Sequence, residues 1–286
     1  MTGFLMQIGG PLQSWGEHSA FNDRDTVAHP TRSGLIGMIA SALGIPRHQA
    51  TPTTNSGEPT PFSQLSHLRF TVRHDRPGLR IRDFHTVGGG LPPHRTVPTA
   101  KGGRRSPGQT TIVSDRHYLA DAVFTVAVTA PHAPDPSHLT TTCAAALTAP
   151  HWPLYLGRRS CPPAAPLVVA THLPDPITEL LTRVPLARAR PSTPQAPDHE
   201  ATVPVRFTAD TPFPPTFPAT ASARASVTSL NDEPVRLQPR DRIYRSRPSY
   251  TTSCQLPAQL CQGYGRDYLD ALMAYLHTFT PEGTDV

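Results

Sequence analysis

Two neighbouring stretches near the N-terminus carry residue types that can bind nucleic acid. One is GPLQSWG (residues 10–16) and the other is PTRSGLIGMIASALGI (residues 30–45). A loop tryptophan can stack on a base, and amide or hydroxyl groups can hydrogen-bond to base edges or phosphates. The free N–H groups of a helix N-terminus favour an anion. We therefore predict nucleic-acid contacts at Gln13, Ser14, Trp15, His18, Arg24, Arg32, Ser33 and Gly34.

The same residues also have structural explanations. Trp15 is somewhat more typical of an anchor that holds a loop against a domain, and Thr31 or Ser33 can cap a helix without any ligand. The predicted helix carries small residues at spacings of three and four, namely Gly34, Gly37, Ser41 and Gly44. Because glycine within a helix costs roughly 1 kcal/mol relative to alanine, this stripe indicates a close approach by another group. For the middle of the helix we expect that approach to be packing against a sheet.

A basic segment at residues 76–116 carries the whole net charge of the chain. It holds eight basic side chains against Asp83 and Asp115, a net charge of +6, while the complete chain has +5. The segment is rich in glycine and proline without sustained periodicity, and loops this long are usually functional or disordered. A merely solvated loop is the alternative to one that becomes ordered on nucleic acid. We favour the second, with contacts at Arg82, Arg95, Lys101, Arg104, Arg105 and Arg116.

Two further groups of arginines are weaker candidates. Arg158 and Arg159 follow a predicted strand end in LYLGRRSCPP, where they either contact phosphate or pair with acidic side chains. A second run is offset only in part by Asp241 and is more typical of a solvated face, although it could flank a bound strand. This run consists of Arg236, Arg240, Arg242, Arg245 and Arg247.

Motifs for catalysis are missing from the sequence. It contains no phosphate-binding Gly-x-x-x-x-Gly-Lys-Ser/Thr loop, no His-Glu-x-x-His helix and no Gly-x-Ser-x-Gly elbow. The 14 histidines lack metal-ligand spacing and the four cysteines form no Cys-x-x-Cys pair, so we expect no metal or cofactor. A metal-independent ribonuclease needs only a base, an acid and a cation. The basic segment could supply them from His85, His94, Lys101, His117 and Tyr118.

The cellular location is predicted from what the N-terminus and the apolar runs lack. The N-terminus does not place a long apolar run after a charged stretch, and no apolar run approaches the length that spans a bilayer. We expect a cytoplasmic protein with reduced thiols and no membrane contact.

The apolar pattern predicts strands at residues 3–8, 65–74, 118–130 and 167–171, with helices at residues 31–43 and 137–149. This order is that of the βαββαβ, ferredoxin-like and RRM-like unit of the α+β class, which many RNA-binding domains use. We assign residues 1–184 to it, interrupted by the insertion at residues 76–116. Residues 185–286 are Pro-rich and mainly β, with a helix at residues 265–279, and form either a C-terminal extension or a small second domain.

Four stretches together resemble the CasD family, the fifth-family CRISPR-associated subunits of type I-E Cascade complexes within the RAMP superfamily. They are GPLQSWG, PTRSGLIGMIASALGI, DRHYLADAVFTVAV and LYLGRRSCPP, and they span about the first 170 residues in the expected order. The resemblance implies a RAMP domain whose β-hairpin thumb corresponds to residues 76–116. It also implies a subunit that binds the 5′ repeat-derived handle of the CRISPR RNA. The implied partners are the large subunit CasA, the backbone subunit CasC and, indirectly, target DNA.

Three hypotheses follow for the function. The first is a non-catalytic RNA-binding subunit of a multisubunit surveillance complex in antiviral defence. The second is a metal-independent endoribonuclease that processes CRISPR repeat RNA, because the equivalent protein of the related type I-C uses Tyr, Lys and His for this step. We do not map that trio onto this chain. The third is a protein-only adaptor whose basic segment holds acidic partner surfaces.

Overall fold

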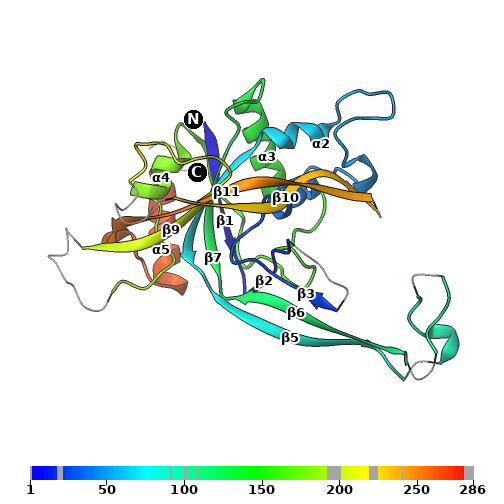
Figure 1. Cartoon of the computed structure of the whole chain (residues 1–286). Coiled ribbons are helices and arrows are strands. Elements are labelled where there is room, and N and C mark those ends of the chain that lie inside the picture. The colour runs from blue at the N-terminus through cyan, green and yellow to red at the C-terminus, as the bar shows by residue number, and fades with distance from the viewer. Residues whose placement is uncertain are drawn as a thin grey trace, which may run out of the picture.

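A seven-stranded sheet forms the centre of the molecule (Figure 1). The computed structural model describes residues 2–17, 22–90, 92–99, 102–106, 109–191, 201–218, 225–239 and 241–279. Four strands of the sheet and two helices follow the predicted order of strand, helix, strand, strand, helix, strand. These elements are β1 (Gly3–Gly9), α1 (Arg32–Ala42), β4 (Arg69–Arg76), β7 (Val123–Thr129), α3 (Pro136–Thr148) and β8 (Val168–Leu173).

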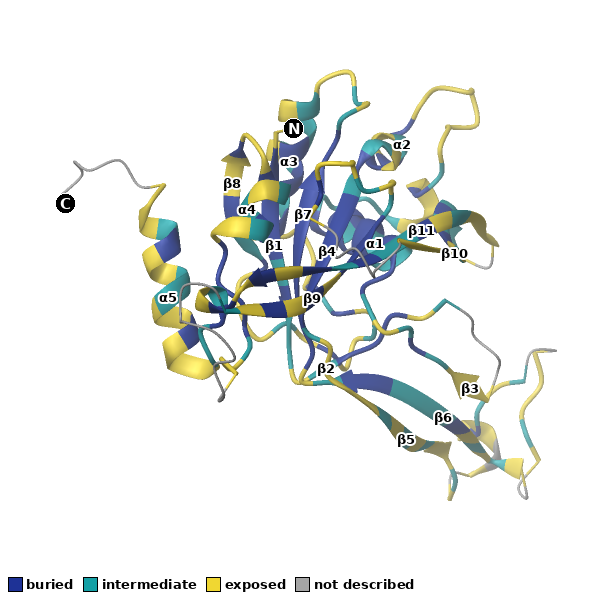
Figure 2. Ribbon diagram, turned by 60° about the vertical axis from the view of Figure 1, so that its left-hand side comes forward, coloured by how far each residue is buried: buried dark blue, intermediate teal, exposed yellow. Residues whose placement is uncertain are grey.

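The four strands lie in the order β4-β7-β1-β8, and every neighbouring pair is antiparallel. β1 is buried on both faces because its side chains alternate between two cores. Phe4, Met6 and Ile8 belong to one core with α1 and α3. Leu5 belongs to the other core, beneath α4 (Pro176–Thr182) and α5 (Gly265–His277). The sheet is therefore covered on both faces (Figure 2).

α1 begins and ends where the sequence predicts. The Thr31 side chain accepts a hydrogen bond from the Gly34 N–H at 3.3 Å, which is an N-cap. Gly44 follows the helix with a φ of +72°, a conformation that L side chains rarely adopt. A Cβ on Gly44 would lie 2.9 Å from the His151 ring, so this turn packs closely against the loop that follows α3.

The predicted strand at residues 118–130 is wrong as a single element. The chain bends at Asp121, whose φ is +57°, and divides it into β6 (Thr111–Ala120) and β7. The strand end predicted at the start of residues 154–163 is also wrong, because the segment holds no strand, while the basic turn predicted to follow it is present.

The basic segment is for the most part a β-hairpin instead of a loop. β5 (Leu79–Gly88) pairs with β6 over ten residue pairs. Two short strands of the N-terminal loop, β2 (Leu12–Gln13) and β3 (Asp23–Arg24), pair with β6 and complete a second sheet. The hairpin projects from the body of the molecule, and Pro93–Arg95 forms a 3-10 turn (η3) near its far end (Figure 1).

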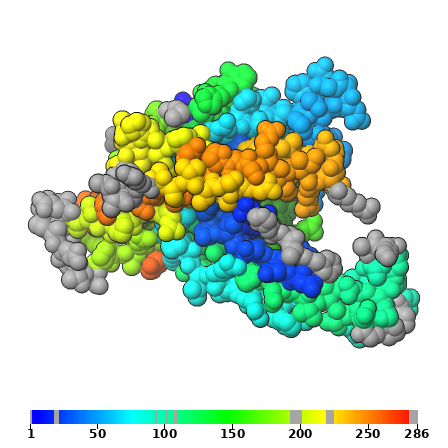
Figure 3. Space-filling model, in the orientation of Figure 1, coloured from blue at the N-terminus to red at the C-terminus, as the bar shows by residue number. Residues whose placement is uncertain are grey.

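The C-terminal strands extend the central sheet. They are β9 (Thr202–Ala209), β10 (Ser226–Gln238) and β11 (Asp241–Pro257). β9 pairs with β4, and the long β10–β11 hairpin continues outwards from β9 and contacts α1. Its yellow-orange band crosses the molecule above the blue N-terminal loop in Figure 3.

Short helical segments complete the connections. These are η1 (Arg47–Gln49), α2 (Pro61–Gln64), η2 (Leu65–His67) and η5 (Ala258–Leu260). None of the helices in the described ranges has both the length and the apolar character that crossing a bilayer requires.

Candidate nucleic-acid interface

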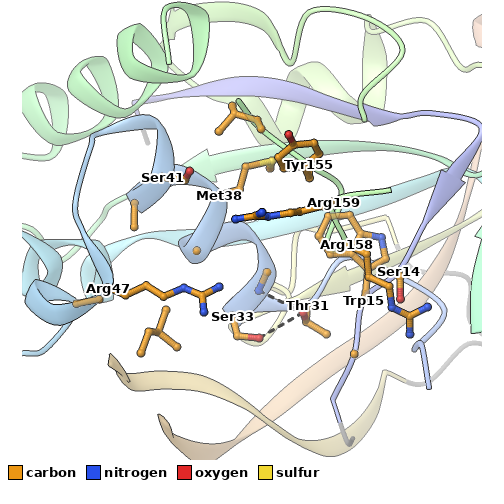
Figure 4. Close-up of a pocket in the computed structure, with 18 of the residues that line it drawn as sticks. Ser14, Trp15, Thr31, Ser33, Met38, Ser41, Arg47, Tyr155, Arg158 and Arg159 are labelled. Carbon is orange, nitrogen blue, oxygen red and sulfur yellow. Dashed lines mark hydrogen bonds between the residues drawn. The ribbon is translucent and has the colours of Figure 1, made fainter. Parts of the chain in front are cut away.

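A groove of about 950 Å³ lies over α1, and we call it the α1 groove. One side of α1 is its floor. The walls come from residues 14–16 and 24–25, from residues 45–47 and 50, from residues 152–155 and 157–159, and from residues 237, 242 and 244. Segments that are far apart in the sequence thus meet at one surface (Figure 4). Of the predicted contact residues, the lining includes Ser14, Trp15, Arg24, Ser33, Gly34, Arg158 and Arg159.

The stripe of small residues on α1 faces this groove. Ser33, Gly37 and Ser41 lie on successive turns and all line it. A Cβ added to Gly37 would meet no heavy atom of the described residues within 4 Å outside the adjacent backbone of its own helix. The expectation that the middle of this stripe packs against a sheet is therefore wrong. The sheet instead contacts the opposite side of α1, through buried residues that include Leu35 and Ile39.

Arginines give the groove a positive charge. Arg24, Arg47, Arg159 and Arg242 have exposed side chains that make no ion pair with any described residue. The acidic residue in the lining is Asp25, whose carboxylate pairs with Arg80 at 2.6 Å. Unpaired guanidinium groups at a concave surface attract polyanions, because the field is concentrated there.

The Gly-Arg-Arg turn is fixed by a close contact with the N-terminal loop. Gly157 has a φ of +90°, and a Cβ at this position would lie 1.8 Å from the Ser14 carbonyl oxygen. The Ser14 N–H also donates to the Leu156 carbonyl at 3.0 Å. Only glycine fits this contact, and the contact places Arg158 and Arg159 beside the groove.

The two arginines of this turn have different surroundings. Arg158 donates to the carbonyls of His117 (3.0 Å) and Arg24 (2.7 Å), and its guanidinium lies 4.6 Å from the centre of the Tyr118 ring. It therefore joins the base of the β5–β6 hairpin to the N-terminal loop. The Arg159 side chain is exposed and extends into the groove (Figure 4).

Gln13 and Trp15 belong to the protein interior, which corrects two of the predicted contacts. Gln13 is fully buried and donates to the Ala122 carbonyl at 2.7 Å. The Trp15 indole N–H donates to the Gln13 side-chain oxygen at 3.0 Å, and Trp15 is only 1% exposed. A Cβ on Gly34 would lie 2.8 Å from the Trp15 ring. Trp15 is thus a loop anchor seated on α1, and its face is covered.

Arg32 also requires correction, because it is 2% exposed and bonded within the protein. It pairs with Glu233 and with Asp210 (2.7 Å), and it donates to two carbonyl groups. Its own backbone N–H donates to the Asp232 carboxylate at 2.7 Å. Asp232 in turn pairs with Arg247 at 2.7 Å. An internal carboxylate occupies the start of α1, so the predicted phosphate contact at Arg32 is wrong.

The hairpin arginines are partly neutralised by neighbouring acidic groups. Arg82 pairs with Asp115 at 3.3 Å, and Arg80 pairs with Asp25. The Arg116 Nε donates to Ser114 at 3.3 Å. Arg95 and Arg104 are exposed near the far end, where Arg104 donates to a carbonyl, and Arg105 is half-buried. Two predicted contacts, His18 and Lys101, lie outside the described residues.

Lys101 aside, which lies outside the described residues, the residues proposed for ribonuclease chemistry are not gathered at one place. The Nε2 of His117 lies 3.4 Å from Asp23, and its Nδ1 accepts a hydrogen bond from Arg80 at 3.4 Å. Tyr118 is 5% exposed and lies beneath Arg158. The register of the hairpin places His85 on the opposite face from His117. Both ring nitrogens of His117 therefore lie close to a charged neighbour, Asp23 at Nε2 and Arg80 at Nδ1.

Several residues of the groove are not among the contacts predicted from the sequence. Arg47, Trp152, Tyr155 and Tyr244 line it, and Gly37 was assigned to packing. Arg47 stands alone in the sequence between uncharged residues, and only the fold brings it to α1. The sequence does carry a signal for Trp152, because it is an aromatic residue between His151 and Pro153 in a predicted loop. Trp152 is 38% exposed and Tyr244 is 36% exposed.

Known proteins resemble this chain in sequence and in structure. Residues 3–249 match the family described as "CRISPR-associated protein (Cas_Cas5)". The "CRISPR system Cascade subunit CasD" of Escherichia coli (strain K12) is 33% identical over 192 residues, which are 64% of this chain and 77% of that protein. A chain in a solved structure titled "CRISPR RNA-guided surveillance complex" is 44% identical, with a TM-score of 0.78. The match covers 96% of this chain and 99% of that one.

A second solved structure, titled "Crystal structure of Cas protein", shares the fold at 24% identity. Its TM-score is 0.54, and the match covers 92% of this chain and 98% of that one. The family match spans most of the chain, and the similarity to CasD agrees with the resemblance predicted from the four sequence stretches. The chain therefore belongs to the Cas5 family of CRISPR-associated proteins.

Proposed function

We propose that this chain is a non-catalytic RNA-binding subunit of a type I-E Cascade complex in the cytoplasm. It holds the 5′ repeat-derived handle of the CRISPR RNA and bridges the large subunit CasA to the backbone subunit CasC in antiviral defence. The observation that carries the proposal is the α1 groove, in a chain that belongs to the Cas5 family. Its exposed arginines have no acidic partner among the described residues, unlike those at the base of the hairpin.

The groove combines the two kinds of contact that RNA recognition needs. Guanidinium groups bind phosphates, which gives affinity and salt dependence without sequence information. Aromatic rings provide stacking surfaces for unpaired bases, and Trp152, Tyr155 and Tyr244 lie among the arginines here. This combination supports single-stranded RNA as the ligand.

The fold supports the same proposal. We infer that β1, α1, β4, β7, α3 and β8 form the ferredoxin-like RAMP domain and that the β5–β6 hairpin is its thumb. The strand order and the position of the hairpin between β4 and β7 support this assignment. β9 pairs directly with β4, which favours residues 185–286 as an extension of this domain over a separate one.

Exposed apolar residues on the hairpin support its contact with another Cascade subunit. Phe84 is 64% exposed and Val113 is 42% exposed. They are diagonal neighbours on one face of the hairpin, because Phe84 pairs with Asp115 and Thr86 pairs with Val113. Large apolar side chains exposed together are typical of a surface that a partner covers.

The test is binding of the full-length chain to handle RNA and to a scrambled control over a salt series in EDTA. The recovered RNA is then run on a denaturing gel. We expect handle-selective binding that weakens with salt and leaves the RNA intact. A discrete product that disappears on His117→Ala would support the endoribonuclease hypothesis instead. Equal affinity for both RNAs would refute selective handle binding and favour the adaptor.

A further inference from the structure

We propose that the backbone of a single RNA strand lies directly against α1 at Gly37, held between Arg47 and Arg159. This inference rests on the proposed function and deepens it, because it names the contact point and the groups that form it. None of the three residues is buried by its neighbours. Each lines the α1 groove, although they come from α1, from η1 and from the loop after α3.

The two arginines approach α1 from opposite walls of the groove. Arg47 extends across the side of the helix that carries Ser33 and Ser41, and Arg159 extends towards the same helix from the other side (Figure 4). Neither guanidinium has a hydrogen bond or ion pair with a described residue. Cationic donors on both sides of a strand can neutralise its phosphates without distorting the backbone.

Gly37 makes room for this strand. It lies on the helix between Ser33 and Ser41, one turn from each, and a Cβ there would meet only open space. No packing requirement within the described protein explains a glycine at this position. A residue that lacks a side chain is, however, what allows another backbone to touch a helix. The hydroxyl groups of Ser33 and Ser41 can donate to phosphate or sugar oxygens on either side of it.

A base stacked on Trp152 completes the proposed contact. Trp152 lies at the same groove and remains 38% exposed, while its ring packs edge-on against His151 with 4.6 Å between the ring centres. His151 is itself seated against the turn at Gly44. Trp152 is thus held in place and can accept a base without first becoming ordered.

The test is the affinity of the full-length chain for fluorescent handle RNA, measured by anisotropy at several salt concentrations. The variants are Gly37→Glu, Arg47→Gln, Arg159→Gln and Trp152→Ala. The matched controls are Ala145→Glu on the exposed side of α3 and Arg266→Gln, whose side chain is 92% exposed on α5. Circular dichroism establishes that each variant remains folded.

We expect Arg47→Gln and Arg159→Gln each to weaken binding about 10- to 100-fold, the range for a hydrogen bond to a charged group. Each should also reduce the slope of log K against log salt by about 0.7. Gly37→Glu should weaken binding at least as much, because it places a bulky anion on the floor of the groove. The controls should bind like the wild-type chain.

The two ways of failing are distinguishable. If the wild-type chain selects handle RNA and the four groove variants bind it equally well, the contact at Gly37 is refuted while the proposed function stands. If the wild-type chain shows no preference for handle RNA, the proposed function fails and this inference fails with it.

Discussion

Alanine substitutions at Gly34 and Gly37 should change the stability of the protein in opposite directions. Both positions lie within α1, where alanine is favoured over glycine by about 0.5–1 kcal/mol. At Gly37 the added methyl group meets no atom within 4 Å, so we expect the full gain. At Gly34 it would lie 2.8 Å from the Trp15 ring, which is buried and hydrogen-bonded to Gln13. Overpacking of this kind costs about 1–3 kcal/mol.

The comparison isolates the contacts of the added methyl group at Gly34, chiefly the Trp15 ring and also the Thr31 hydroxyl at 3.1 Å, because a helix-propensity gain is expected in both variants. The free energies of unfolding should therefore differ by about 1–3 kcal/mol, with Gly37→Ala the more stable variant. Urea unfolding followed by circular dichroism measures both values under one set of conditions. Equal stabilities would show that Trp15 is not seated on α1 and would refute the argument that its face is covered.

Three further predictions concern groups held in close contacts within the protein. Burial lowers the pKa of His74 well below 6.5, with His29 contributing, so protons favour the unfolded chain. The contribution of neutral His74 to the free energy of unfolding is fully present above pH 6.5. Below pH 6.5 it declines by at most about 1.4 kcal/mol per pH unit. Unfolding at pH 7.5 and 5.5 measures this loss, which should be smaller in His74→Gln. Arg73→Met removes one partner of a fully buried ion pair with Asp75 and should cost about 3–5 kcal/mol by urea unfolding. Gly157→Ala should lower both the melting temperature and RNA binding, because no Cβ fits against the Ser14 carbonyl; unchanged values would refute that contact.

Local signals in the sequence were sufficient for several elements of the central sheet and for α1. The cap at Thr31, the glycine after α1 and the alternating apolar residues of β1 each fix an element through neighbouring residues. These elements could be predicted because the residues that define each one are close together in the sequence. The hairpin was predicted as a basic loop, since its strands are interrupted by charge and half-exposed, and only the resemblance pointed to a thumb.

Long-range contacts explain why some site residues were assigned wrongly. Arg32 has the sequence context of a phosphate ligand, but its partners Asp210 and Glu233 lie far along the chain. Trp15 likewise appears exposed until α1 and Gln13 are placed around it. Neither the ion pairs of Arg32 nor the burial of Trp15 can be predicted from the neighbouring residues in the sequence.

The interaction partners of an arginine show whether it is structural or a candidate for RNA contact. They do so better than the density of charge along the sequence does. Arg32 and Arg73 are buried and paired, and Arg247 is paired with only 12% of its side chain exposed. Arg32 and Arg247 join the start of α1 to the C-terminal strands. Arg47 and Arg159 have no acidic partner among the described residues, and the fold brings them together over a helix surface of mostly small residues. An unpaired cation gains nothing for stability, while its field remains available to a phosphate. For this reason we assign RNA contact to the α1 groove first and to the more highly charged hairpin second.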